Sequence, residues 1–196
     1  MPKLLPPATR ALVVANALLY FFYFLLGLPF MNRLALWPTR TPWFHLWQML
    51  TYSFMQISIL HLLVNMAVLV FLGRSLERLW GARNYLLYYF ACVLAAAGIW
   101  LAWAAITAYP SSTAGASGGV FGLLLAYALV DPKAPVLEGV RYVPRWLFVF
   151  LFGALELLLG VFDAHAGVAH FAHLGGMVGG ALMIAFWRTA RPVPRR

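Results

Sequence analysis

The sequence predicts an all-α membrane protein, a bundle of six transmembrane helices with its N- and C-termini in the cytoplasm. Composition is the first observation: 64% of the 196 residues are hydrophobic, 10% are charged, and the mean hydropathy is +0.84. These values lie far outside the range of soluble globular domains. Six apolar segments and a one-sided distribution of basic residues are the second and third observations. We expect residues 1–196 to form a single membrane domain.

The first apolar run covers residues 11–28 and follows two basic residues, Lys3 and Arg10. No cleavage site for a signal peptidase follows it, so we expect an uncleaved membrane helix in which Asn16 is a polar packing group. Residues 30–58 combine prolines with many aromatic side chains, a composition that suits the membrane interface. This segment predicts short helices in the headgroup region rather than a further span.

The remaining apolar segments predict five more helices, and Gly81 is a plausible stop between the first two of them. Their expected bounds are residues 59–80, 84–107, 117–130, 146–162 and 168–187. A loop rich in Pro, Ser, Thr and Gly precedes the helix that begins at Ser117.

The basic residues orient this bundle. With a cytoplasmic N-terminus and six spans, twelve of the 14 Lys and Arg residues lie on the cytoplasmic side, and only Arg33 and Arg40 lie outside. Such an excess is typical of cytoplasmic loops. Residues 1–10 and 188–196 are then basic cytoplasmic tails. Topology and attraction to anionic lipids explain the net charge of +9, so we expect the bilayer, and no nucleic acid, as a partner.

Ser117 is expected below the outer surface of the membrane. Residues 117–130 span roughly 21 Å as a helix, whereas the hydrocarbon core is about 30 Å thick. With Val130 at the inner boundary, Ser117 would begin its helix roughly 10 Å below the outer surface. Irregular backbone at that depth is tolerated where protein encloses it or where it lines a water-filled cavity. The geometry therefore predicts a watery pocket with Ser117 on its floor.

Three further polar residues are expected at a similar depth. His173 lies on the order of 8 Å below the same surface, and His61 and Asn65 share one face near the outer end of their helix. Each of them alone could be an ordinary interhelical hydrogen bond, and Ser117 alone could bond back to a carbonyl. Their common depth favours a functional site.

These residue types suit nucleophilic catalysis. A serine hydroxyl becomes a nucleophile when a neutral imidazole takes its proton. The oxyanion that forms needs donors aimed at it, and the Asn65 amide, the His61 imidazole and the backbone N–H of Ser117 can donate.

Two histidines compete as the base, because His170 lies one turn above His173. Glu156 is in the middle of a span and Asp163 is in a loop, so a Ser–His dyad without a carboxylate is the simpler interpretation. A metal site formed by His61, His170 and His173 is disfavoured, because no carboxylate ligand accompanies them.

With these residues assembled, the chain resembles the rhomboid family of intramembrane serine proteases over about residues 43–187. The segment His61-Leu-Leu-Val-Asn65 is similar to the family's His-x-x-x-Asn motif. Gly115-Ala-Ser117-Gly118 is similar to its Gly-x-Ser-Gly motif, and Ala172-His173-Leu174-Gly175-Gly176 to the motif of its catalytic histidine. Glu77 matches a glutamate that helps to fix the inner end of the second helix in the family.

The resemblance implies a six-helix rhomboid-like bundle in which Ser117 and His173 form a catalytic dyad, and it decides between the two histidines in favour of His173. It assigns His61, Asn65 and the backbone N–H of Ser117 to the oxyanion hole. It also implies cleavage of single-pass transmembrane proteins near the outer boundary of their membrane helix, with no metal and no cofactor. We expect the protein in a bacterial inner membrane.

Two residues of the first loop depart from the family's pattern. Gln48 follows Trp47 where many members have an arginine, and Gln56 stands where many have a further histidine. Neither is a core catalytic group. The alternative function is that of a non-enzymatic rhomboid-like membrane protein that binds transmembrane clients, or of a small transporter. In either case Ser117 and His173 would be dispensable.

Overall fold

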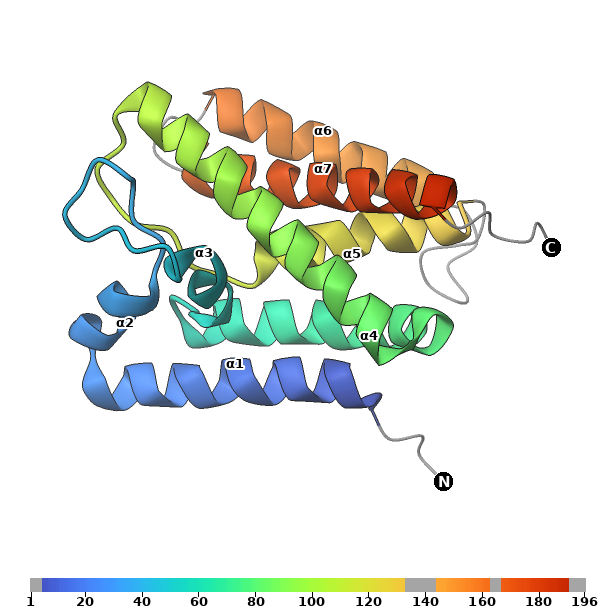
Figure 1. The fold of residues 1–196 in the computed structure, drawn as a ribbon, viewed down its shortest axis with the longest axis horizontal. Helices are drawn as coiled ribbons and strands as arrows, with labels where there is room; N and C mark the ends of the chain where they lie inside the picture. The colour runs from blue at the N-terminus through green and yellow to red at the C-terminus, as the bar shows by residue number, and fades with distance from the viewer. Residues whose placement is uncertain (1–4, 133–143, 163–166, 191–196) are drawn as a thin grey trace.

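The computed structural model describes residues 5–132, 144–162 and 167–190. Within these residues the chain is helical, apart from loops and one isolated β-bridge between Leu36 and Thr113. Figure 1 shows the long helices side by side, with α2 and α3 at one end of the bundle. In chain order the elements are α1 (Pro7–Leu26), α2 (Leu28–Leu34), α3 (Gln48–Thr51), the short 3-10 helix η1 (Tyr52–Phe54), α4 (Ile59–Thr107), α5 (Ser117–Val130), α6 (Arg145–Phe162) and α7 (Gly167–Ala190).

Helix α1 begins earlier than predicted, and its first turn is held by a distant residue. The carboxylate of Glu77 accepts hydrogen bonds from the backbone N–H groups of Ala8 and Thr9 at 2.8 and 2.7 Å. A carboxylate is favourable there because the first turn of a helix has unpaired N–H groups and a positive dipole end. The helix ends at Leu26 and is followed by Gly27, whose φ of 70° is a left-handed conformation that glycine adopts easily.

Helix α4 consists of two arms that meet at Gly81, where φ is 75° and the backbone is not helical. We call residues 59–80 the first arm and residues 82–107 the second arm. The predicted break at Gly81 is confirmed, but the helix resumes at once instead of at Asn84. Figure 1 shows the first arm beside α1 and the second arm crossing the molecule.

Glycines let α7 pack closely on two neighbours. Gly176 faces α5, where a methyl group would overlap the carbonyl oxygen of Gly118. Gly175 and Gly179 face the second arm of α4, where added methyl groups would meet the backbone and Ala95. Such close backbone approach is typical of helices that associate within a membrane. It brings the beginning of α5 next to α7.

The first loop is built around a wholly buried glutamine, Gln48. Its Oε1 accepts hydrogen bonds from the backbone N–H groups of Trp37 and His45, at 3.3 and 3.1 Å. Its Nε2 donates to the carbonyl oxygens of Trp43 and Arg33, at 2.9 and 3.4 Å. The short helices predicted for this loop are confirmed as α2, α3 and η1, and their depth in the bilayer stays a prediction.

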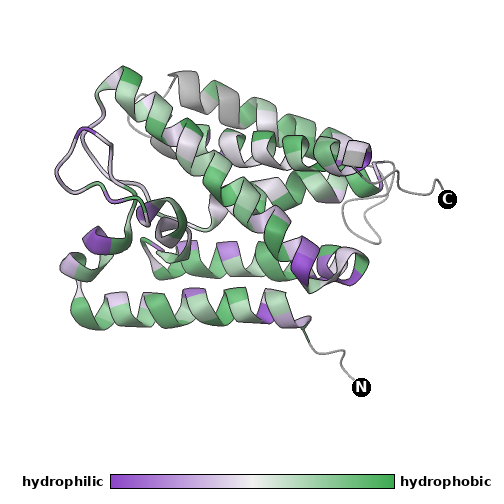
Figure 2. Ribbon diagram, viewed as in Figure 1, coloured by the Kyte–Doolittle hydropathy of each residue, from purple (hydrophilic) through white to green (hydrophobic). Residues whose placement is uncertain are grey.

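The outer surface of the bundle is apolar along its length. Three described helices are long and apolar enough to cross a membrane: Pro7–Leu26, Ile59–Thr107 and His170–Thr189. Ser117–Val130 and Arg145–Leu155 are shorter apolar helices. Only 17–33% of the residues in the three spanning windows are buried inside the protein, and many large hydrophobic side chains are exposed. Figure 2 shows hydrophobic residues along the whole length of the helices. Lipid contact explains such a surface, so this is an integral membrane protein.

Candidate active site

Ser117 and His173 are in direct contact. The distance between Ser117 Oγ and His173 Nε2 is 2.8 Å, which is within the range of a hydrogen bond. Ser117 is the first residue of α5, and His173 lies in α7, so the close packing of these two helices brings the side chains together. Both residues are half-buried, so the pair remains partly accessible. In Figure 1, α5 begins partway along the bundle, which places the pair away from the end that carries α2.

A residue that the sequence analysis did not single out supports the histidine. The ring of Phe121 stacks on the ring of His173, with centroids 4.2 Å apart and planes 6° from parallel. Phe121 lies one helical turn after Ser117, so it projects from the same side of α5. The i, i+4 spacing from the serine could have pointed to Phe121, but an aromatic residue in an apolar helix is usually a packing residue. The stacked ring limits how far the imidazole can rotate.

The His61 side chain faces the same small space as Ser117. A Cβ added at Gly115 would lie 2.9 Å from His61 Cε1, 3.3 Å from His61 Nε2 and 3.4 Å from Ser117 Oγ. His61 Nδ1 accepts a hydrogen bond from the backbone N–H of Ile57 at 3.4 Å. The neutral ring therefore carries its proton on Nε2. This tautomer presents an N–H donor to the space beside the serine hydroxyl.

The loop before Ser117 is fixed to the first loop by backbone hydrogen bonds. Leu36 and Thr113 exchange two of them, each 2.9 Å long, and the N–H of Gly115 donates to the carbonyl oxygen of Tyr52 at 3.0 Å. Tyr52 is itself anchored, because its hydroxyl donates to the carbonyl oxygen of Val93 on the second arm at 2.9 Å. Burial raises the pKa of Tyr52, which keeps this donor protonated. The loop is thereby held in one conformation.

Asn65 lies one helical turn beyond His61 on the first arm and is buried. Its Nδ2 donates to Oε1 of Gln56 at 3.0 Å, which leaves the second hydrogen of this nitrogen for another acceptor. The ring of His170 lies 6.2 Å from that of His173 and nearly perpendicular to it. His170 is therefore a neighbour of the pair.

The side chain of Glu156 and the whole of Asp163 lie outside the described residues.

The Ser117 hydroxyl contacts the His173 imidazole, and the N–H of His61 lies beside it. These are the groups that acyl transfer needs. They lie inside a helical bundle with an apolar outer surface, so the class of protein is a membrane-embedded one. The comparison with known families agrees with this class. The model of the rhomboid domain matches residues 44–189. The chain belongs to the rhomboid family of intramembrane proteases.

Curated relatives carry the name rhomboid protease GlpG. The protein from Yersinia pestis (strain Pestoides F) is 28% identical over 186 residues, which cover 93% of this chain and 63% of the relative. The protein from Photorhabdus laumondii subsp. laumondii is 28% identical over 183 residues, which cover 92% of this chain and 61% of the relative. The chain thus spans less than two thirds of the length of these relatives.

Proposed function

We propose that this protein is an intramembrane serine endopeptidase that uses Ser117 and His173 as a catalytic dyad. The observation that carries the proposal is the 2.8 Å contact between Ser117 Oγ and His173 Nε2. Membership of the rhomboid family supports it. The half-buried setting of both residues supports it further, because a peptide must reach the hydroxyl.

The proposed reaction is acyl transfer to serine followed by hydrolysis. His173 Nε2 takes the proton of Ser117 Oγ while the oxygen attacks the scissile carbonyl carbon. The resulting oxyanion accepts hydrogen bonds from His61 Nε2, Asn65 Nδ2 and the backbone N–H of Ser117. Collapse of this intermediate expels the amine, which receives the proton from His173. Water then attacks the acyl group with His173 as the base, and Ser117 is regenerated.

The proposed substrates are single-pass transmembrane proteins, cleaved near the outer boundary of their membrane helix. The short α5 supports this depth. Its 14 residues are fewer than the roughly 20 of a full membrane helix, so with its last residue at the inner boundary its first residue, Ser117, would lie below the outer surface, and the loop before it would complete this span. We further propose that the two arms of α4, with α1, α5, α6 and α7, are six spans in a bacterial inner membrane, with both termini in the cytoplasm.

A serine-reactive fluorophosphonate tests the dyad directly. Ser117 Oγ attacks phosphorus, fluoride leaves, and His173 takes the hydroxyl proton. We expect Ser117→Ala to abolish labelling, and His173→Ala to reduce its rate at least about 1000-fold. Cleavage of a membrane-tethered reporter with one transmembrane helix should be lost in parallel. His170→Ala is the matched control and should retain labelling.

Each outcome separates the protease from the alternative. Helical content and thermal unfolding in detergent should be unchanged in Ser117→Ala, which shows that the loss is chemical. Reporter cleavage that persists in Ser117→Ala contradicts the proposal. Reporter binding without cleavage in the unaltered protein would favour the non-enzymatic client-binding function.

A further inference from the structure

A chain of three buried side-chain amides lies behind Asn65. Asn65 Nδ2 donates to Gln56 Oε1 at 3.0 Å, and Gln56 Nε2 donates to Asn16 Oδ1 at 2.8 Å. Asn16 Nδ2 in turn donates to the carbonyl oxygen of Leu12 at 2.9 Å. Asn16 and Gln56 have no exposed surface, and Asn65 is 5% exposed. The chain thus links α1 and the segment before α4 to the candidate oxyanion hole.

The chain of amides has a fixed direction. A backbone carbonyl oxygen can only accept, so the amide nitrogen of Asn16 must face Leu12 and its oxygen must face Gln56. Gln56 then presents its nitrogen to Asn16 and its oxygen to Asn65. Gln56 Oε1 accepts the hydrogen bond from Asn65 Nδ2, so the amide nitrogen of Asn65 points toward Gln56. A rotated Asn65 amide would place two acceptor oxygens against each other in a buried site.

We propose that Gln56 and Asn16 are positioning residues, which keep the amide nitrogen of Asn65 aimed as a donor to the oxyanion. The inference rests on the proposed function. A nitrogen with two hydrogens can give one to Gln56 and the other to the substrate. An aligned donor stabilises an oxyanion because it needs no reorganisation during the reaction. Asn16 lies in α1, outside the residues that the rhomboid model matches.

The first experiment measures how fast the fluorophosphonate labels Ser117 in the full chain. Gln56→Met and Asn16→Leu each remove a side-chain amide and keep a side chain of similar volume. We expect each to lower the maximal labelling rate about tenfold to 100-fold, below the loss for a deleted oxyanion donor. The probe concentration at half-maximal rate should stay unchanged. As the neutral acid favoured by burial, Asn16→Asp keeps an acceptor for Gln56 and an O–H donor for the Leu12 carbonyl oxygen, so it should restore most of the rate.

A double-mutant cycle tests whether Gln56 acts through Asn65. In an Asn65→Ala background the donor is already absent, so Gln56→Met should lower the rate less than twofold. The matched control is Gln48→Met, which removes an equally buried glutamine of the same loop with no hydrogen bond to Asn65. Any loss caused by Gln48→Met should be the same in both backgrounds.

The outcomes separate the positioning role from the proposed function. Equal losses for Gln56→Met with and without Asn65 would reduce Gln56 to a packing residue and overturn the inference, while labelling of Ser117 still upheld the protease. A labelling rate in Asn16→Asp that is no higher than in Asn16→Leu would also overturn the inference. Absence of labelling in the unaltered protein would contradict the protease, and the positioning role with it.

Discussion

The space beside Gly115 decides how the candidate site is arranged at the scale of single residues. Its φ of 147° lies outside the range that residues with a side chain adopt readily. The missing side chain leaves room between His61 and Ser117, where a carbonyl oxygen of a substrate would need to lie. Position 115 therefore requires glycine for two reasons: its backbone conformation, and the room that a side chain would take up between His61 and Ser117.

Gly115→Ala should lower the fluorophosphonate labelling rate at least about tenfold, because the added methyl group displaces His61 and fills the proposed oxyanion hole. Gly98→Ala is the matched control, since a Cβ at Gly98 would meet no atom within 4 Å. The control should label normally. Equal labelling of both variants would contradict the proposed position of the oxyanion.

The sequence alone predicts only part of the candidate site. Spacing and helix length put Ser117, His61 and His173 at one depth, since these depend on distances along a helix. The ring of Phe121 on His173 and the bond from Gln56 to Asn16 depend instead on which helix faces meet. That choice is made by tertiary packing, for which a single sequence has no periodic signal.

At the scale of elements, the joint between α1 and the first arm is an ionic cap. Glu77 is 3% exposed, and besides the two backbone bonds its carboxylate accepts one from the Thr9 hydroxyl at 2.7 Å. The structure thus gives Glu77 several donors from α1. The early start of α1 was missed although Pro7, at its first position, is a local start signal. The cap itself comes from Glu77, far along the sequence, and therefore has no local signature.

Glu77→Gln should destabilise the protein by about 1–3 kcal/mol, because an amide nitrogen would replace an oxygen that faces backbone N–H groups. Thermal unfolding in detergent, followed by circular dichroism, measures the effect. Arg78→Gln changes the exposed neighbour and should leave the midpoint unchanged. An unchanged midpoint in Glu77→Gln would show that the cap contributes nothing.

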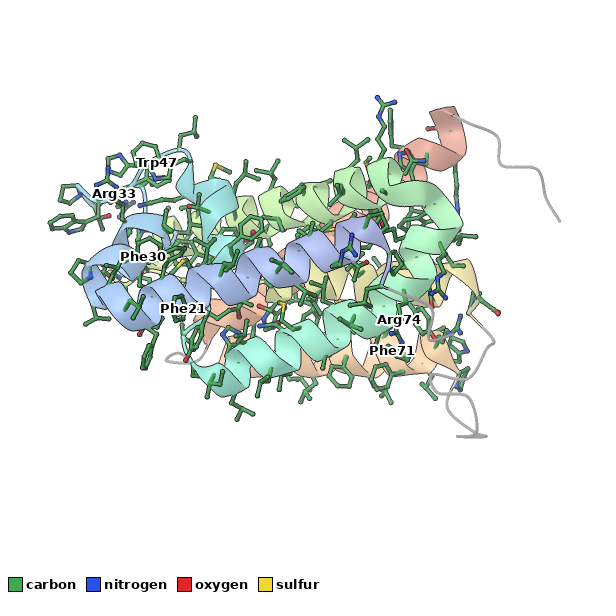
Figure 3. All side chains as sticks on the ribbon, turned by 90° about the horizontal axis from the view of Figure 1, so that it is seen from below. Phe21, Phe30, Arg33, Trp47, Phe71 and Arg74 are labelled. Atoms are coloured by element: carbon green, nitrogen blue, oxygen red, sulfur yellow. The ribbon has the colours of Figure 1, made fainter. Side chains whose placement is uncertain are left out.

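Charge is divided between the two ends of the whole molecule. Figure 3 shows Arg33 and Trp47 at one end and Arg74 at the other. Figure 1 shows that α1 begins and α7 ends at the end where the arms of α4 meet. The all-helical class predicted from composition is confirmed for the described residues, because hydropathy reports directly on contact with lipid. The orientation in the membrane remains a prediction.

Cysteine labelling tests this orientation. The single native cysteine, Cys92, is buried, so the unaltered chain should give a low background. A membrane-impermeant maleimide should label Thr39→Cys in intact bacterial cells, because the first loop would face outward. Arg83→Cys should be labelled only after the membrane is broken. The reverse pattern would invert the proposed topology.

The bridge between Leu36 and Thr113 also has a consequence for the order of folding. It joins the first loop, which precedes α4, to the loop that follows α4, so all 49 residues of α4 lie between the two bonded residues. Contacts between distant residues form only after the intervening chain has closed. Because closing so long a segment costs chain entropy, we expect the loop that leads into Ser117 to reach its final shape late, after the more local contacts of α4 have formed. A partly synthesised chain that already contains Ser117 but not yet α7 would lack His173, the residue proposed to activate the serine.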